Sequence, residues 1–303
     1  MTELTDFQKK ITLSLPEVTI LLQEPLHKHT SFRIGGEAEA MAFPKSEQEL
    51  AKLLAFSKEQ GCKVAILGAG TNVLAPDEGV QGLVICLKDC LDGMELIGDT
   101  TLRVAAGVTM TRAAIFAANH GLSGLEFAHG IPGTVGGGVY MNAGAYGGEI
   151  SGVCKEVRVM SMDGEVKDNT PEEMAFSYRH SRLEETGGII LRADFALAKK
   201  EPEEIKATMR QLQQKRAASQ PLDLPSAGSA FKRPVGGYAA ALIDQAGLKG
   251  YQVGGAAVST KHAGFAVNLG GATAGDVKTL LKSVSDIVYS QSGIRLEPEI
   301  RIW

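Results

Sequence analysis

Residues 129–148 read HGIPGTVGGGVYMNAGAYGG, and their composition sets them apart from the rest of the chain. The stretch holds eight of the 36 glycines and no Asp, Glu, Lys or Arg. Glycine lets the main chain take a positive φ and lets a ligand approach backbone N–H groups directly. Because one glycine usually suffices for a turn, we favour a loop that wraps an anionic or planar ligand. A tightly packed loop between core elements is the alternative.

A second glycine loop, GAGTNVL at 68–74, follows the predicted strand KVAIL at 63–67. It is similar to the dinucleotide fingerprint G-x-G-x-x-G, but Val73 occupies the sixth position, where Gly or Ala is needed. Pro76 and the glycines after it exclude the helix whose N-terminus would hold a pyrophosphate. The sequence therefore predicts a phosphate-type loop of a kind other than the Rossmann one.

Strands and helices alternate around these two loops. Period-two patterns and turn residues predict strands at 39–43, 63–67, 83–87, 101–106, 153–162, 189–197 and 294–303, with a hairpin turn at Asp163-Gly164. Helices are expected over 46–61, 109–121, 202–218, 237–247 and 273–288, in a short segment after Thr170, and in pieces over 1–24 broken at Pro16. Ser46, Thr109, Thr170 and Thr273 are the expected N-caps.

The composition is that of an ordinary globular protein with room for two or three domains. The chain has 303 residues, of which 44% are hydrophobic and 22% charged, and its formal net charge is −4. This charge argues against a nucleic-acid or membrane-surface partner, although a local basic pocket for a phosphate is still allowed. Any anion is therefore expected to bind in a pocket.

Charged residues and two prolines interrupt the apolar residues of the N-terminal segment, so it shows neither a signal peptide nor an anchor. No transmembrane run follows, and we expect a cytoplasmic protein. The four cysteines form no C-x-x-C pair and have no His at metal-ligand spacing. We expect reduced, mostly buried thiols and no metal at Cys62, Cys86, Cys90 and Cys154.

The predicted terminal strand has one apolar and one charged face. Period two places Ile294, Leu296, Pro298, Ile300 and Ile302 on the first, and Arg295, Glu297, Glu299, Arg301 and Trp303 on the second. A charged face is usually solvated, which is the simpler interpretation. A carboxylate beside an arginine on rigid backbone would also suit acid chemistry near an anion.

Other polar residues carry little information one at a time. Ser229 lacks the G-x-S-x-G elbow of a nucleophile, and the adjacent Lys232-Arg233 pair merely hints at a phosphate. Arg179 in Y-R-H-S is by default a surface or ion-paired arginine. A lone histidine such as His180 or His262 is more often structural than a ligand.

Eight segments taken together identify a family. They are SFRIGG (31–36), GAGTNVL (68–74), GIPGTVGG (130–137), NAGAYGGE (142–149), SYRHS (177–181), AGSAFKRP (227–234), KHAGFAVN (261–268) and LEPEIRI (296–302). In this order, from about Lys28 onward, they closely resemble the UDP-N-acetylenolpyruvoylglucosamine reductase (MurB) family. The resemblance implies a flavoenzyme that completes UDP-N-acetylmuramic acid, a bacterial peptidoglycan precursor.

The resemblance also implies an α+β fold. It comprises an FAD-binding domain of the PCMH or vanillyl-alcohol-oxidase type, made of two subdomains, and a C-terminal α+β substrate-binding domain. The implied limits are 1–28 for an N-terminal helical arm, 29–196 for the FAD-binding domain and 197–303 for the substrate-binding domain. Such a fold explains why the loop at 68–74 fails the Rossmann pattern.

By this resemblance the cofactors are FAD and NADPH. The flavin should be non-covalent, because covalent relatives carry a His in the first loop, where this chain has Ala69, Thr71 and Asn72. The residues expected to contact FAD, largely through backbone donors, are Gly68, Ala69, Gly70, Thr71, Asn72, Val73, Leu74, Gly130, Ile131, Pro132, Gly133, Thr134, Gly136, Gly137, Asn142, Gly144 and Ala145.

The family's catalytic residues fall on Arg179, Ser229 and Glu299. Ser229 would protonate C2 of the substrate, while the other two would stabilise the negative charge that hydride transfer to C3 creates. The expected substrate-binding residues are Tyr178, Lys232, Arg233, His262, Asn268 and Arg301. The expected partners are a UDP-sugar enolpyruvyl ether and NADPH, with no nucleic acid or membrane, and we expect a monomer.

One branch of the family carries an inserted, tyrosine-bearing loop soon after the catalytic arginine. Here HSRLEETGGIILRADF (180–195) passes directly into the next strand without such a tyrosine, as in the shorter branch. The family resemblance therefore does not identify the segment that covers the bound substrate.

Two alternatives to the reductase activity are an FAD-dependent sugar or alcohol oxidase of the same fold and a nucleotide-binding module without activity.

Overall fold

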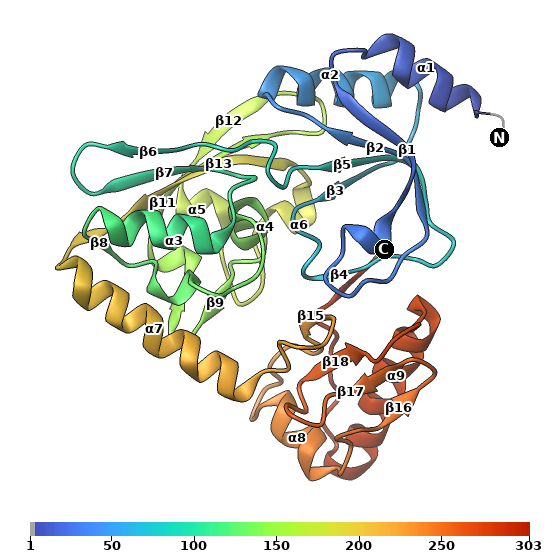
Figure 1. Cartoon of the computed structure of the whole chain (residues 1–303), viewed down its shortest axis with the longest axis vertical. Helices are drawn as coiled ribbons and strands as arrows, with labels where there is room; N and C mark the ends of the chain where they lie inside the picture. The colour runs from blue at the N-terminus through green and yellow to red at the C-terminus, as the bar shows by residue number, and fades with distance from the viewer. Residues whose placement is uncertain (1–3) are drawn as a thin grey trace. The chain divides into compact units, whose positions relative to one another are not determined.

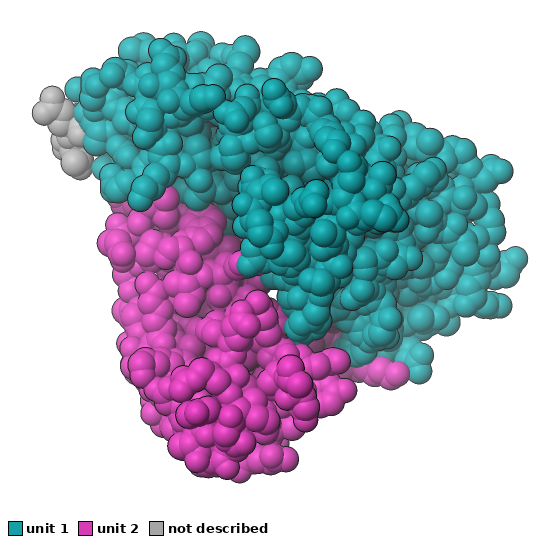
Figure 2. Space-filling model, turned by 180° about the vertical axis from the view of Figure 1, so that it is seen from behind, with its two compact units in different colours: residues 1–23, 39–69, 81–214 teal, residues 24–38, 70–80, 215–303 magenta. Residues whose placement is uncertain are grey.

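The computed structural model describes residues 4–303, so the first three residues of the predicted N-terminal arm lie outside the described residues. Contacts divide the chain into two compact units (Figure 2). The first unit comprises the residues up to Gln23, Glu39–Ala69 and Gln81–Gln214; the second comprises Glu24–Ala38, Gly70–Val80 and Lys215–Trp303. The domain limits 1–28, 29–196 and 197–303 run along the sequence, whereas the units group segments by contact. Those limits stay a prediction.

The first unit contains an antiparallel five-stranded sheet in the order β12-β11-β13-β7-β6 (Figure 1). The strands are β12 (Val166–Asn169), β11 (Cys154–Met160), β13 (Ile189–Ala196), β7 (Thr101–Ala105) and β6 (Met94–Ile97). The predicted hairpin at Asp163-Gly164 joins β11 and β12, and Gly164 has a φ of +87° there. Because this turn conformation favours glycine, the turn residues and the strand pairing agree.

Helices α3 (Met110–Asn119) and α4 (Val135–Tyr140) pack on one face of this sheet, together with the beginning of α7 (Pro202–Ser219). The hydroxyl of Thr109 accepts the Arg112 N–H and so caps α3 as predicted. Four small residues of α3, namely Ala113, Ala114, Ala117 and Ala118, are buried in the shared core. Small side chains let α3 approach its neighbours closely.

A bulge in β13 lets one strand contribute to two cores. Arg158 pairs with Arg192 and Val159 with Ile190, so Leu191 is the extra residue. An extra residue reverses which face the following side chains point to. Beyond the bulge Ala193 and Phe195 join the core under α3, whereas Leu191 and Ile189 join a second core.

That second core lies under the four-stranded sheet β1-β2-β5-β3, whose strands are β1 (Thr19–Pro25), β2 (Glu37–Phe43), β5 (Val80–Cys86) and β3 (Val64–Leu67). Helices α1 (Asp6–Ser14) and α2 (Glu47–Glu59) supply Ile11, Leu50 and Leu53 to it. Two cores within one unit correspond to the two subdomains expected for the FAD-binding α+β fold.

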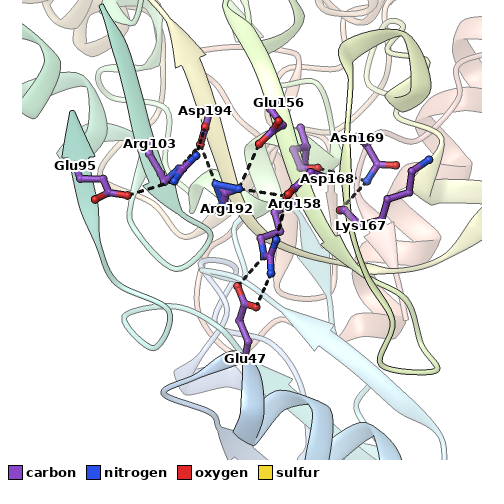
Figure 3. A network of polar contacts seen from close by, with 11 residues as sticks. Glu47, Glu95, Arg103, Glu156, Arg158, Lys167, Asp168, Asn169, Arg192 and Asp194 are labelled. Carbon is purple, nitrogen blue, oxygen red and sulfur yellow. Dashed lines mark hydrogen bonds and ion pairs between the residues drawn. The ribbon is translucent and has the colours of Figure 1, made fainter. Parts of the chain in front are cut away.

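Polar side chains form a charged network in the first unit (Figure 3). Arg103 donates two hydrogen bonds to Asp194, at 2.9 and 2.7 Å, and the side chain of Asp194 is 7% exposed. Arg192 contacts Asp168 and Glu156, and Arg158 joins Asp168 to Glu47 at the start of α2. The network, with Glu95 at its edge, links all five strands of this sheet and one helix.

The second unit is built on the sheet β15-β18-β17-β16, with strands β15 (Ser226–Ser229), β18 (Phe265–Asn268), β17 (Ala256–Val258) and β16 (Gln252–Val253). Its helices are α8 (Ala239–Gln245) and α9 (Ala274–Ser292). Thr273 and Asp276 form the predicted capping box of α9. A short parallel pair joins β4 (Val73–Leu74) to β19 (Arg301–Ile302).

The remaining elements are short. They are η1 (Leu26–Lys28), β8 (Leu122–Ser123), η2 (Glu126–Ala128), β9 (Gly144–Ala145), β10 (Gly148–Glu149), η3 (Ile150–Gly152), α5 (Pro171–Met174), α6 (Leu183–Thr186) and β14 (Ala198–Lys199). No helix among the described residues is both long and apolar enough to span a membrane. All four cysteines are free thiols, and burial raises the pKa of Cys154 to about 12.

Two predictions of secondary structure are wrong. The helical piece expected before Glu24 is strand β1, whose side chains alternate between partly buried and exposed positions, as a strand requires. The terminal strand expected over 294–303 is limited to Arg301–Ile302. Pro298 has no N–H to donate to a strand ladder. Of the residues predicted to lie on the apolar face, Leu296 and Ile300 are buried, whereas Ile302 is 45% exposed.

Candidate active site

The glycine stretch 129–148 is only partly a loop, because its centre forms the six-residue helix α4. Thr134 caps this helix and is buried. A Cβ added to Gly136 would lie 3.0 Å from the Ala106 Cβ, and one on Gly138 would lie 2.8 Å from the Met110 sulfur. Close packing therefore explains these two glycines, as the alternative interpretation proposed.

Gly137 differs from its two neighbours. It is exposed, and among the described residues outside the helix backbone a Cβ there would meet only the Thr134 hydroxyl, at 3.6 Å. Packing gives no reason for a glycine at this position. An open backbone face at Gly137 is what a ligand-binding glycine requires.

The start of the stretch is fixed to α3. Gly130 and Gly133 have φ values of +84° and +135°, a region that favours glycine. The Gly130 N–H donates to the Thr111 hydroxyl at 3.2 Å, and the Met110 N–H donates to the Gly133 carbonyl at 3.0 Å. The predicted cofactor residues Ile131 and Pro132 lie between these two anchored glycines, and the Ile131 N–H donates to the Ala128 carbonyl.

The SYRHS segment is attached to the end of the glycine stretch by three hydrogen bonds. The Asn142 amide donates to the Ser177 carbonyl at 3.0 Å, and the Ser181 hydroxyl donates to the Tyr140 carbonyl at 2.8 Å. The third bond runs from the Arg179 guanidinium to the Gly144 carbonyl at 3.3 Å. The first unit thus brings the predicted catalytic arginine to two predicted cofactor residues.

Arg179 lies in a turn closed by reciprocal backbone bonds between Ser177 and His180, and its φ is +57°. Such values are uncommon for residues other than glycine, and strained positions of this kind cluster at functional sites. The Arg179 guanidinium lies 4.9 Å from the centre of the Tyr178 ring, which is 46% exposed. The turn therefore presents a cation and an aromatic ring side by side.

The loop at 68–74 is divided between the units, with Gly68 and Ala69 in the first and Gly70–Leu74 in the second. Within the first unit, a Cβ on Gly68 would lie 2.7 Å from the Thr134 hydroxyl, so the two glycine segments are in contact. Within the second unit, Gly70 has a φ of +62°, and a Cβ there would lie 2.1 Å from the His29 carbonyl oxygen. No larger residue fits at Gly70 without moving the backbone.

Ser229 and Glu299 lie on neighbouring segments of the second unit. The Glu299 N–H donates to the Ala230 carbonyl at 2.9 Å, and the Lys232 N–H donates to the Glu297 carbonyl at 2.8 Å. Phe231 and Pro298 form an antiparallel bridge between these bonds. Two catalytic residues predicted from distant parts of the sequence therefore share one local backbone arrangement.

Among the predicted phosphate ligands, Lys232 is ion-paired to Glu297 at 2.6 Å, and the Arg233 guanidinium lies 4.6 Å from the centre of the Tyr238 ring. Arg301 lies in β19, where its N–H donates to the Asn72 carbonyl at 3.0 Å. Lys232, Arg233 and Arg301 all belong to the second unit, as does Ser229.

His262 is a neutral donor at physiological pH. The Gly264 N–H donates to its Nδ1 at 3.1 Å, so in the neutral ring the proton lies on Nε2. Burial holds the pKa of His262 below its usual value of 6.5. The side chain can therefore offer one Nε2–H hydrogen bond to a ligand.

Asn268 has a different environment from the other predicted substrate residues. It is buried; its amide nitrogen donates to the Phe32 carbonyl at 3.0 Å, and its oxygen accepts the Gly270 and Ala272 N–H groups. The structure thus uses this side chain to connect segments of the second unit. Its role in substrate binding stays a prediction.

Sequence reasoning missed two residues that hold the second unit together. The Ser31 hydroxyl donates to the Ser226 carbonyl at 2.6 Å, and its N–H donates to the Gly70 carbonyl. The carboxylate of Asp77 accepts the Ala274 and Gly275 N–H groups at the start of α9, at 2.7 and 3.1 Å. Asp77 caps α9 from a distant position in the chain, so no local sequence pattern predicts this role.

These residues fit a flavin held without a covalent bond. The stretch 129–148 has no charged side chain, Gly137 exposes its backbone, and the first loop has no histidine that could link to the ring. A planar, anionic group bound through backbone donors suits this environment. The segments predicted to hold FAD are Gly68–Leu74, Gly130–Gly137 and Asn142–Ala145.

Comparison with family models gives two matches. Residues 38–169 match an FAD binding domain, and this range includes both glycine segments. Residues 220–303 match the C-terminal domain of UDP-N-acetylenolpyruvoylglucosamine reductase, and this range includes Ser229 and Glu299.

Individual relatives agree with the family models. The chain is 47% identical to UDP-N-acetylenolpyruvoylglucosamine reductase of Agathobacter rectalis over 98% of both chains. It is 43% identical to the enzyme of that name from Streptococcus pneumoniae strain 70585 over 97% of both. The crystal structure of the Thermus caldophilus reductase (MurB) matches with a TM-score of 0.81 and 37% identity, covering 94% of this chain and 98% of that one. The chain therefore belongs to the UDP-N-acetylenolpyruvoylglucosamine reductase family.

Proposed function

We propose that the chain is an FAD-containing enzyme that uses NADPH to reduce UDP-N-acetylglucosamine enolpyruvate to UDP-N-acetylmuramate, in peptidoglycan precursor synthesis. The observation that carries the proposal is the pairing of the Ser229 and Glu299 segments through the Glu299 N–H and the Ala230 carbonyl. A proton donor and a carboxylate on adjacent backbones suit protonation of a carbon next to a developing anion.

Bound FAD would supply the redox chemistry of the reaction, in which a hydride from NADPH reaches C3 of the enolpyruvyl ether. Ser229 delivers the proton to C2, and a positioned donor of this kind contributes about 10²–10⁴-fold to the rate. The guanidinium of Arg179 and the carboxyl group of Glu299 stabilise the negative charge that builds at C2 and on the substrate carboxylate. The reaction thus adds one hydride and one proton across the carbon–carbon double bond of the substrate.

The substrate's diphosphate carries negative charge, and cationic side chains of the second unit are suited to it. Lys232, Arg233 and Arg301 are the proposed ligands, and the Nε2–H of His262 adds a neutral donor. Tyr178 is proposed to contact the substrate beside Arg179. Lys232 would exchange its contact with Glu297 for a phosphate oxygen.

Finer features of the protein are part of the same proposal. We propose a cytoplasmic protein, because the formal net charge of −4 favours neither a membrane-surface nor a nucleic-acid partner. We further propose that it is a monomer. We also propose the shorter branch of the family. The support is that the chain runs from Arg179 through α6 into β13 within ten residues, without room for an inserted loop.

The test separates the two halves of the reaction. In a Ser229→Ala variant, NADPH should still bleach the flavin absorbance, but the enolpyruvyl substrate should restore it at least about 10²-fold more slowly than in the wild type. Ser290→Ala, which removes an exposed hydroxyl of α9, is the matched control and should behave as the wild type. Normal reoxidation of Ser229→Ala would remove Ser229 from the role of proton donor.

The role of Glu299 is tested against its neighbour. Glu299→Gln should slow reoxidation by the substrate, whereas Glu297→Gln should leave that step largely unchanged. The opposite result would assign the catalytic carboxylate to Glu297. Rapid reoxidation by air with no response to the UDP substrate would instead indicate a sugar or alcohol oxidase, and failure to bind FAD would indicate a module without activity.

A further inference from the structure

Asn72 connects the first glycine loop to the segment that carries Glu299. Its side-chain Nδ2 donates to the Glu299 carbonyl at 3.2 Å, across a separation of 227 residues in the sequence. Its own carbonyl accepts the Arg301 N–H at 3.0 Å. Asn72 therefore contacts the chain on both sides of Ile300.

The backbone of Glu299 is held from two directions. Its N–H donates to the Ala230 carbonyl, next to Ser229, and its C=O accepts the Asn72 amide. With both backbone polar groups of one residue bonded, the direction of its Cα–Cβ bond is fixed by the two segments that hold them. One segment carries the proposed proton donor, and the other belongs to the cofactor loop.

A regular sheet does not provide the second of these contacts. The parallel ladder between β4 and β19 pairs Val73 with Arg301 and Leu74 with Ile302, so Glu299 lies before its start. Pro298, just before Glu299, has no N–H to donate. The Asn72 side chain thus extends the ladder by one bond where backbone pairing stops.

We infer that Asn72 is a positioning residue for Glu299, an inference that rests on the function proposed above. Its side chain orients the catalytic carboxyl group with respect to Ser229. Displacing a catalytic group by about 1 Å can cost roughly 10²-fold in rate. Loss of the Asn72 amide should therefore slow reoxidation of the flavin by the substrate and affect FAD binding much less.

The experiment compares Asn72→Ala and Asn72→Asp with the wild type. Asn72→Asp keeps the size of the side chain but replaces the donor with a carboxylate that the Glu299 carbonyl repels. Both variants should be reoxidised by the enolpyruvyl substrate about 10- to 100-fold more slowly. Because the contact expected between Asn72 and FAD is made by the backbone, which both variants retain, the Kd for FAD, titrated on the apoprotein, and the rate of bleaching by NADPH should change less than about threefold. Asn169→Ala, which removes a similar side-chain bond to the Val157 carbonyl, is the control.

A second measurement does not depend on activity. In the apoprotein of Asn72→Ala, hydrogen–deuterium exchange should become faster at the Glu299 amide and stay unchanged at Phe265 in β18. Unchanged exchange together with wild-type reoxidation would overturn the inference. So would a parallel loss of FAD affinity, bleaching and reoxidation, because that pattern marks a flavin ligand or a general structural residue.

The proposed function and the inference fail in different ways. If the wild-type protein bleaches with NADPH but never responds to the enolpyruvyl substrate, the proposed function is wrong and the inference falls with it. If the wild type turns over while Asn72→Asp matches it in every measurement, the inference alone is wrong.

Discussion

The two units hold their proposed functional residues in different ways. In the first unit, Arg179 and the glycine stretch lie within about fifty residues of each other, and regular strands and packed helices surround them. In the second unit, three segments far apart in the chain share one hydrophobic core, to which Phe32 and Leu74 belong. Long-range hydrogen bonds also join these segments at Ser31, Asn72 and Asp77. Segments close together in the sequence form the first arrangement, whereas contacts between distant segments form the second.

This difference determines where a single substitution should matter. A core or a charged network has many contacts, so the loss of one is shared among its neighbours. The bond from the Asn72 side chain to the Glu299 carbonyl is not duplicated by a ladder pair, so its loss is not shared in this way. Substitutions at the junctions of the second unit should therefore affect function more strongly than substitutions of equal size in the first.

The largest effect is expected for Gly70→Ala. The φ of +62° costs an alanine about 1–2 kcal/mol, and the clash with the His29 carbonyl adds to this, so we expect a loss of about 3 kcal/mol in the free energy of unfolding. FAD binding should be lost as well. Urea unfolding of the apoprotein and titration with FAD measure the two effects.

Gly61→Ala is the control for Gly70→Ala, because Gly61 has nearly the same φ, +63°, with no described neighbour within 4 Å of an added Cβ. This substitution introduces the backbone strain without a clash, and it should lower the free energy of unfolding by about 1–2 kcal/mol. Equal losses in the two variants would show that the packing around Gly70 contributes nothing.

Arg103→Gln tests the charged network of the first unit. It removes the paired hydrogen bonds to the largely buried Asp194, although Arg192 still contacts that carboxylate at 3.4 Å. Because Arg192 compensates in part, we expect a loss of about 1–2 kcal/mol by urea unfolding and unchanged flavin bleaching by NADPH. A loss of FAD binding would show that this unit also depends on single contacts.

Gly137→Ala separates ligand binding from packing within α4. Alanine in an open helical position should stabilise the apoprotein by up to about 1 kcal/mol, yet the added methyl group should weaken FAD binding. Gly138→Ala, which meets the Met110 sulfur, should show the opposite pattern of lower stability and nearly normal affinity. Equal FAD affinity in Gly137→Ala and the wild type would contradict a ligand at this face.

The smallest effect concerns the pH dependence of the second unit. Burial lowers the pKa of His262 in the folded protein, so the neutral form is favoured there. Its contribution to stability is present above the unfolded pKa of about 6.5 and is lost as the pH falls through the folded value. Between pH 7.5 and 5, the wild type should lose slightly more stability than His262→Asn in urea unfolding. Parallel profiles would contradict the assignment.

Local patterns predicted most of the regular elements. The caps Ser46, Thr109, Thr170 and Thr273 are confirmed, because a cap and its helix are neighbours in the sequence. Strand β1 and helix α4 were missed for opposite reasons. Strand β1 forms because it pairs with another strand of its sheet. Helix α4 contains three glycines, and packing against Ala106 and Met110 allows it to form.

The candidate site was predicted from its family resemblance and not from local chemistry. Ser229 and Arg179 carry no signal alone, and the sequence does not show that Ala230 pairs with Glu299. The bonds made by Asn72 and Asp77 join segments far apart in the chain, so no spacing rule could reveal them. The resemblance predicts that Asn268 binds substrate, whereas the contacts of its amide within the second unit could not be read from the sequence.

The pairing of β4 with β19 has a consequence for the order in which the protein folds. Contacts that span a separation such as the 227 residues between Asn72 and Glu299 close a very long loop, and long-range contacts of this kind form late. The helices and hairpins of the first unit need no such closure. We therefore expect the cofactor loop to take its final shape near the end of folding, when β19 docks and Glu299 reaches its place.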